Sequence, residues 1–140
     1  RIMGNRQHFL NFNQKTPKIL SELGFIYDST FGSTKQVGFK DNKYNPFYYY
    51  KLLEIPINVM DSTLFNQYGS YDKSYKKIRN LINIAEKKSA LITFNWHQGV
   101  FFEPEFKGFG KLYIQILEYL KKKNAHVDTL GNISLSFKNG

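Results

Sequence analysis

Residues 55–61, with the sequence IPINVMD, indicate the fold more clearly than any other stretch of this chain. The apolar run that opens this stretch is typical of a buried strand, and it stops at Asp61. Shorter or similar runs at 25–27 and 90–96 predict strands in the same way. The sequence therefore predicts several buried strands, each followed directly by polar residues.

Three helices are predicted around these strands by apolar stripes and by residues typical of helix ends. Thr16, followed by a proline, is typical of a helix start with Thr as the cap and Pro in the first helical position. Gly24 is well placed to end this helix. Apolar residues on one face predict a second helix that begins after Ser70 or Asp72, and a third helix over 109–123.

The remaining segments are shorter or less regular. Segment 29–53 is rich in glycine and aromatic residues, and we expect a long irregular loop of the kind that carries binding residues. The end of a strand within residues 4–12, a short strand at 125–128 and a short final element at 133–137 complete the expected order.

This alternation of strands and helices predicts an α/β fold with about five parallel strands and outer helices. Five strands are too few for a closed barrel, which needs about eight. An open doubly wound sheet and part of a β/α barrel both fit the pattern. Because the chain begins with Arg1 rather than Met, we expect residues 1–140 to be a single domain that forms the later portion of a larger barrel.

Composition excludes several classes of protein. The 140 residues include no cysteine, which excludes a disulfide scaffold, a thiol nucleophile and a Cys-ligated zinc site. No apolar run approaches the roughly 18 residues of a spanning helix, so no membrane span is expected. The formal charge of +9 comes mostly from lysines near predicted helix ends, with only three arginines, so we expect no nucleic-acid partner. The oligomeric state and the compartment, bacterial cytoplasm or cell envelope, stay open.

Candidate functional residues follow from the predicted strand ends, because ligands bind at the carboxyl ends of strands in parallel α/β folds. The residues near these ends are Arg6, His8, Asp28, Asp61 and His97. Both aspartates could instead close turns by accepting backbone N–H bonds, and His97 could be a strand-end residue without a chemical role. Trp96 and Tyr48 could stack on sugar rings or simply cover the edge of the core.

Several short motifs at these positions share their order and spacing with a known family. They are Gly4-Asn5-Arg6-Gln7-His8, Tyr27-Asp28-Ser29-Thr30, Leu53-Glu54-Ile55-Pro56, Val59-Met60-Asp61 and Asn95-Trp96-His97. In this order they resemble the polysaccharide deacetylase family, a group of carbohydrate esterases with a nodulation-type deacetylase domain. The resemblance covers nearly the whole chain. It implies a distorted β/α barrel and metal-dependent removal of acetyl groups from the N-acetyl sugars of a glycan.

The resemblance also implies roles for individual residues. His97 matches the late histidine that protonates the leaving amine, and Arg6 matches the arginine that orients the catalytic base. Asp28 matches the aspartate of the motif that follows. We expect these three residues to be catalytic, and we expect contacts to an acetylated polysaccharide or oligosaccharide from His8, Asp61, Trp96 and Tyr48.

The chain departs from the family at the metal centre. The family's Thr-Phe-Asp-Asp run and His-x-x-x-His pair are both missing, and the late motif is Asn-Trp-His in place of Leu-x-His. We therefore expect no metal ligand in this chain, and we expect zinc or another divalent metal to bind upstream of Arg1 in the full-length enzyme. Two alternatives are a non-catalytic carbohydrate-binding barrel module that uses the aromatic loop 44–50 and a basic nucleic-acid-binding domain.

Overall fold

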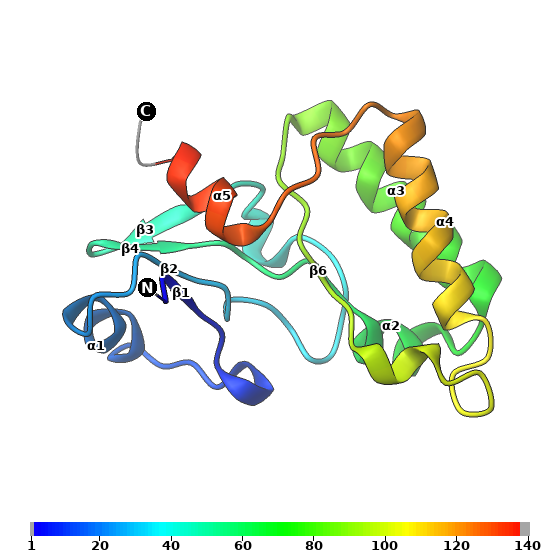
Figure 1. The fold of residues 1–140 in the computed structure, drawn as a ribbon, viewed down its shortest axis with the longest axis horizontal. Helices are drawn as coiled ribbons and strands as arrows, with labels where there is room; N and C mark the ends of the chain where they lie inside the picture. The colour runs from blue at the N-terminus through cyan, green and yellow to red at the C-terminus, as the bar shows by residue number, and fades with distance from the viewer. Residues whose placement is uncertain (1, 138–140) are drawn as a thin grey trace.

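The computed structural model describes residues 2–137, which form an α/β arrangement of six short strands and five helices. Their order along the chain is β1 (Gly4–Asn5), α1 (Thr16–Glu22), β2 (Tyr27–Asp28), β3 (Phe47–Tyr49), β4 (Leu52–Glu54), β5 (Val59–Met60), α2 (Asp61–Tyr68), α3 (Tyr71–Lys88), β6 (Phe94–Asn95), α4 (Phe109–Lys122) and α5 (Leu130–Ser136). The predicted α/β class is thus confirmed (Figure 1).

The strands form two sheets that are mostly parallel. The larger sheet has the order β1-β2-β4-β3, in which β3 alone is antiparallel, and the smaller sheet pairs β5 with β6 in parallel. In the larger sheet Asn5, Asp28 and Glu54 lie in one register row. Met60 and Asn95 pair at the end of the smaller sheet. The carboxyl ends of five parallel strands therefore carry most of the predicted polar residues.

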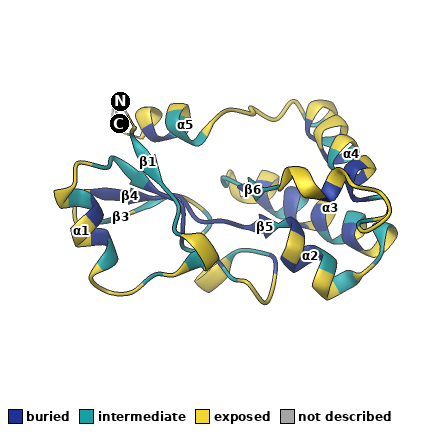
Figure 2. Cartoon of the chain, turned by 60° about the horizontal axis from the view of Figure 1, so that its bottom comes forward, coloured by how far each residue is buried: buried dark blue, intermediate teal, exposed yellow. Residues whose placement is uncertain are grey.

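Hydrophobic packing concentrates on the smaller sheet and the helices beside it. The core cluster joins α2, α3 and α4 to β5 and includes Val59, Leu64, Ile78, Phe109 and Leu112, all fully buried. Helices α3 and α4 pack against each other through their apolar stripes, as Figure 2 shows by the buried residues that face inward. This packing fixes the start of α2 and the end of β6, which hold two of the candidate residues.

Two sequence predictions within segments 29–53 and 55–60 were wrong. Segment 29–53 is irregular only as far as residue 46, and its end contains β3 and most of β4, which pair as an antiparallel hairpin. The strand predicted over 55–60 pairs only at β5. Pro56 has no N–H to donate, and Ile55 and Ile57 donate to Asp28 and Phe31, outside any regular ladder.

Three further predictions were corrected. Helix α2 was not expected, although Asp61 is favoured in a first helical turn. The strand predicted at 125–128 is an exposed extended segment, since no other described strand lies beside it. Helix α1 includes Thr16 as its first residue, and Asn13 caps this end by accepting the N–H bonds of Lys15 and Thr16. In residues 2–137 we find no helix long and apolar enough to cross a membrane.

Candidate active site at the carboxyl ends of the strands

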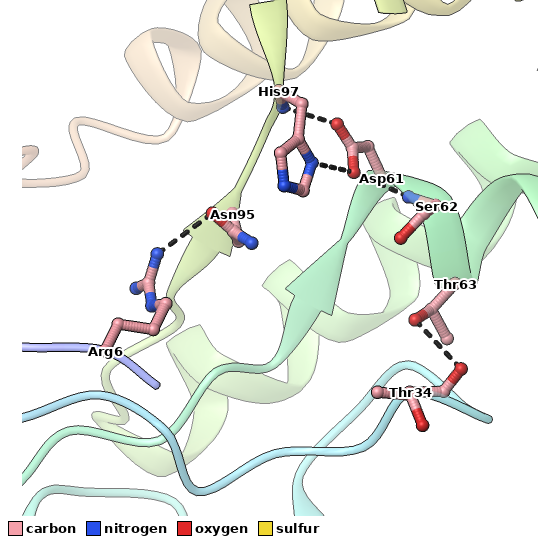
Figure 3. Close-up of polar contacts among 7 residues, drawn as sticks. All are labelled: Arg6, Thr34, Asp61, Ser62, Thr63, Asn95 and His97. Atoms are coloured by element: carbon pink, nitrogen blue, oxygen red, sulfur yellow. Dashed lines mark hydrogen bonds and ion pairs between the residues drawn. The ribbon is translucent and has the colours of Figure 1, made fainter. Parts of the chain in front are cut away.

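An exposed histidine, His97, pairs with a buried carboxylate, Asp61, at the strand ends. Asp61 opens α2 directly after β5, and His97 follows β6, so the parallel pairing of these strands brings the two residues together. The His97 Nδ1 atom lies 2.7 Å from the Asp61 Oδ1 atom, and the His97 backbone N–H donates to Asp61 Oδ2 at 2.5 Å (Figure 3). The Asp61 side chain is fully buried, whereas 56% of the His97 side chain is exposed.

This geometry fixes the role of each nitrogen of the imidazole. Asp61 also accepts the backbone N–H of Ser62 at 2.6 Å, so its carboxylate has three donors around it. Because a carboxylate can only accept, His97 Nδ1 carries a proton toward it. The Nε2 atom then points away from Asp61, on the side of Asn95 and Arg6 (Figure 3). Such an imidazole can exchange a proton with a bound molecule through Nε2.

Arg6 follows β1 and spans the gap between the two sheets. Its guanidinium donates to the backbone carbonyl and the hydroxyl of Ser29, both at 3.0 Å, and to the Asn95 side-chain oxygen at 2.9 Å. Burial lowers the pKa of Arg6, and the nearby charge of Asp28 opposes that shift. All three hydrogen-bond acceptors of Arg6 are neutral. Its positive charge therefore lies at the strand ends without a carboxylate bonded directly to it.

Asp28 and its neighbour Glu54 are both fully buried. Asp28 accepts from the Asn5 side-chain amide at 2.8 Å and from the Thr30 backbone N–H at 3.1 Å. Glu54 accepts the Phe31 N–H through Oε1, while its Oε2 atom has no hydrogen-bond partner among the described residues. The pKa of Glu54 is raised to about 8, chiefly by burial and also by the charge of Asp28, while the Phe31 hydrogen bond opposes the rise.

The raised pKa means that Glu54 is largely protonated at neutral pH. The neutral acid needs an acceptor for its proton, and its register partner Asp28 supplies the nearest carboxylate oxygens. The protonated Glu54 thus lies beside Asp28, the carboxylate that accepts from the Asn5 side-chain amide.

Comparisons with protein-family models, curated proteins and solved structures found no match to this chain.

Four of the seven predicted site residues come together: Arg6, Asp28, Asp61 and His97 line one edge of the two sheets. Asp28 accepts the N–H two residues on, so the turn alternative also describes part of its bonding. Asp61 bonds the next N–H and the histidine together.

The other three predicted residues lie elsewhere. His8 is exposed and its ring contacts Phe9, with 4.1 Å between centroids. The Trp96 ring packs against Phe109 and Tyr113 of α4, and its Nε1 atom is buried without a partner among the described residues. Tyr48 lies on the β3–β4 hairpin, where 54% of it is exposed. Their roles in substrate binding stay predictions.

Sequence reasoning missed four polar residues of this edge: Asn5, Ser29, Glu54 and Asn95. Glu54 carried a usable signal, because a charged residue inside the apolar run Leu52–Ile55 must be buried with the strand. Asn95 carried a weaker one, since it directly precedes the Trp-His pair. The partners of both residues depend on pairing between strands far apart in the sequence.

The described residues do not fit the metal that the family resemblance implies. Within residues 2–137 no three His, Cys, Asp or Glu side chains lie close enough together to hold a metal ion. At the strand-end site Asp61 and His97 are hydrogen-bonded to each other. The prediction that metal ligands lie upstream of Arg1 stays a prediction.

Proposed function

We propose that this chain supplies the general acid of a hydrolytic site that removes N-acetyl groups from a glycan. The observation that carries the proposal is the His97–Asp61 pair, in which a fully buried carboxylate holds an exposed imidazole at the carboxyl end of a parallel strand. The resemblance of the strand-end motifs to polysaccharide deacetylases supports this reaction over other hydrolyses. Hydrolysis of an N-acetyl group breaks a C–N bond and releases acetate and an amine.

In this proposal His97 protonates the leaving nitrogen. The doubly protonated imidazole gives up its Nε2 proton, and the Nδ1 proton stays on the ring, hydrogen-bonded to Asp61. The buried carboxylate keeps the ring in one orientation, with Nδ1 directed at Asp61 and Nε2 left for the substrate. General acid catalysis of this kind contributes about 10²–10⁴-fold to a rate.

Arg6 and Asp28 act as positioning residues in the proposal. Asp28, through Asn5, holds the end of β1, and Arg6 connects that end to Asn95 beside the histidine. The guanidinium also places a positive charge next to the space in front of His97 Nε2. Its charge favours a negatively charged group in the space, including an oxyanion formed at an acetyl carbonyl.

A divalent metal would lower the pKa of a bound water and polarise the acetyl carbonyl. The proposal assigns the ligands of that metal to protein outside residues 2–137, in keeping with the expectation from the family pattern. No step of the mechanism given for His97, Asp61 and Arg6 depends on where those ligands lie.

The test is acetate release by the intact protein, supplied with zinc, from oligomers of N-acetylglucosamine. We expect equal amounts of acetate and new amine. In His97→Gln we expect the rate to fall by about 100-fold or more. His126→Gln is the matched control, because His126 is another exposed histidine that pairs only with Asp128. No acetate from the parent protein, or equal rates for parent and His97→Gln, would overturn the proposal.

A further inference from the structure

An open cavity lies beside the strand-end site, on the side of the larger sheet. It has a volume of about 670 Å³ and is lined by the segment after β1, the loop after β2 and the end of the β3–β4 hairpin. Helix α1 and the hairpin lie at the same end of the molecule in Figure 1. The loop after β2 borders both places, because Ser29 bonds Arg6 while Phe31 and Gly32 line the cavity.

Five of the twelve residues that line this cavity are aromatic. Tyr49 packs against Phe12 across the cavity rim, with 5.9 Å between ring centroids. Tyr48 and Tyr50 also line it, and they keep 54% and 72% of their surface exposed. The Tyr48 hydroxyl donates to the Phe137 carbonyl at 3.4 Å. An exposed tyrosine ring offers a flat apolar face beside a polar hydroxyl group, which suits the face of a sugar ring.

Backbone strain concentrates on the same rim. The described residues other than glycine with positive φ include Asp41, Asn42, Ser89 and Asn124, whose types tolerate that conformation comparatively well. The others are the bulky residues Phe9, Leu10 and Tyr50, at φ of 57°, 52° and 54°. Leu10 and Tyr50 line the cavity, and Phe9 is adjacent. Bulky residues held in this region are a sign of a functional constraint.

The charge of the cavity is positive. Its described lining contains no Asp or Glu, and its one charged residue is Lys40. The Lys40 ammonium donates to the Gly32 carbonyl at 3.0 Å and lies 4.5 Å from the centre of the Phe31 ring. None of the ion pairs among residues 2–137 involves Lys40. The ammonium is thus held at the cavity while its charge stays available to an anion.

We propose that this cavity is a subsite for an acidic sugar residue, which stacks on the tyrosines and places its anionic group on Lys40. The inference rests on the proposed function in one respect: the bound glycan would run along the loop after β2 toward His97. It adds the substrate class, a glycan that carries carboxylate or sulfate groups, which the His97–Asp61 pair does not specify.

The test is calorimetric binding by the intact protein of three hexasaccharides: hyaluronan, chondroitin sulfate and the neutral N-acetylglucosamine oligomer. We expect at least one acidic oligomer to bind about fivefold or more tightly than the neutral one, and Lys40→Gln to remove that advantage. The two acidic oligomers separate carboxylate from sulfate recognition. Lys35→Gln, a change of an exposed lysine outside the cavity, is the control and leaves affinity unchanged.

Tyr50→Gly is a second variant, and it distinguishes loss of binding from misfolding because it should raise the stability of the protein. Glycine relieves the positive φ, so the melting temperature rises by about 3 °C while affinity for the acidic oligomer falls. Asn124→Gly, at a positive φ far along the chain, raises stability without changing affinity.

Equal binding of acidic and neutral oligomers would overturn the inference, as would equally tight binding of polyglutamate, which has the charge but no sugar. The proposed function is judged separately, because His97→Gln removes acetate release without weakening binding in this cavity. Normal acetate release with no preference for acidic oligomers would therefore contradict the subsite alone.

Discussion

The same three residues, Asp-Ser-Thr, occur at the carboxyl ends of β2 and β5, and the two copies have different roles. Asp28 and Asp61 are both fully buried. Asp28 faces inward, to Asn5 and the carboxyl group of Glu54, whereas Asp61 faces an exposed histidine. The first stretch continues as a loop and the second begins a helix.

The serines of the two copies differ in burial and bonding, whereas the threonines act alike. Ser29 is buried, donates to the Ile55 carbonyl at 2.7 Å and accepts from Arg6, while Ser62 is exposed. Both threonines tie down a neighbouring loop, Thr30 through the Gln7 N–H and Thr63 through the Thr34 carbonyl. The local motif supplies a buried carboxylate in both places. The residues on the neighbouring strand determine whether that carboxylate stabilises the fold, as Asp28 does, or orients a histidine, as Asp61 does.

The largest expected effect is on activity, at the second copy. Asp61→Asn replaces one acceptor oxygen by a donor, so the side chain cannot accept from all three of its present donors. The imidazole then loses its fixed tautomer, and kcat/KM falls by about 10²–10⁴-fold. Acetate release measured at equal fractions of folded protein checks this. A fall of only a few-fold would show that Asp61 does not act through His97.

At the first copy the main effect is on stability. Asp28→Ala leaves the Asn5 amide and the Thr30 N–H without their acceptor in a buried place, and we expect a loss of about 3 kcal/mol in the free energy of unfolding. Denaturant unfolding measures it, with Glu118→Ala, at an exposed carboxylate on α4, as a control that changes stability by less than about 0.5 kcal/mol. Similar losses in both variants would contradict the supporting role of Asp28.

The carboxyl pair also predicts how stability depends on pH. The pKa of Glu54 is raised to about 8 in the folded chain from an ordinary value of 4.5. The folded state therefore holds the extra proton between these values, so this contribution to stability is full below about pH 4.5 and is lost as pH rises through about 8.

For one proton the slope is at most about 1.4 kcal/mol per pH unit. Glu54→Gln removes the titration, and unfolding measured between these pH values should show a smaller loss of stability than in the parent protein. An identical pH dependence in the two proteins would mean that Glu54 does not carry the proton.

The smallest expected difference separates the two serines. Ser29→Ala removes a buried hydroxyl that bonds both Arg6 and Ile55, at a cost of about 1–2 kcal/mol. Ser62→Ala changes an exposed hydroxyl without a hydrogen-bond role and costs less than about 0.5 kcal/mol. Paired unfolding measurements distinguish the two, and equal costs would remove this part of the comparison.

The sequence predicts those parts of the fold that depend on local patterns. Helices α3 and α4 have apolar stripes of regular spacing, and their predicted positions are confirmed to within a few residues. The β3–β4 hairpin was missed because its tight turn is Tyr50-Lys51, without the Asn-Gly or Asp-Gly pair that marks such turns. The positive φ of Tyr50 belongs to this turn, and the sequence has no Gly or Asn there to indicate it.

The candidate site was predictable in a similar way. Arg6, Asp28, Asp61 and His97 follow strands, and parallel strands bring such residues to one edge. That Asp61 bonds His97 while Asp28 bonds Asn5 depends on the pairing of β5 with β6 and of β1 with β2, which no local pattern shows. Glu54 was missed for the same reason, because its importance comes from its register partner.

The most direct measurement of the central claim is the protonation of the His97 ring, from its nitrogen chemical shifts in labelled intact protein at a pH where the imidazole is neutral. The Asp61 contact predicts a proton on Nδ1 and a free Nε2, and Asp61→Asn should give a mixture of the two forms. A neutral ring that carries its proton on Nε2 in the parent protein would contradict the proposed acid.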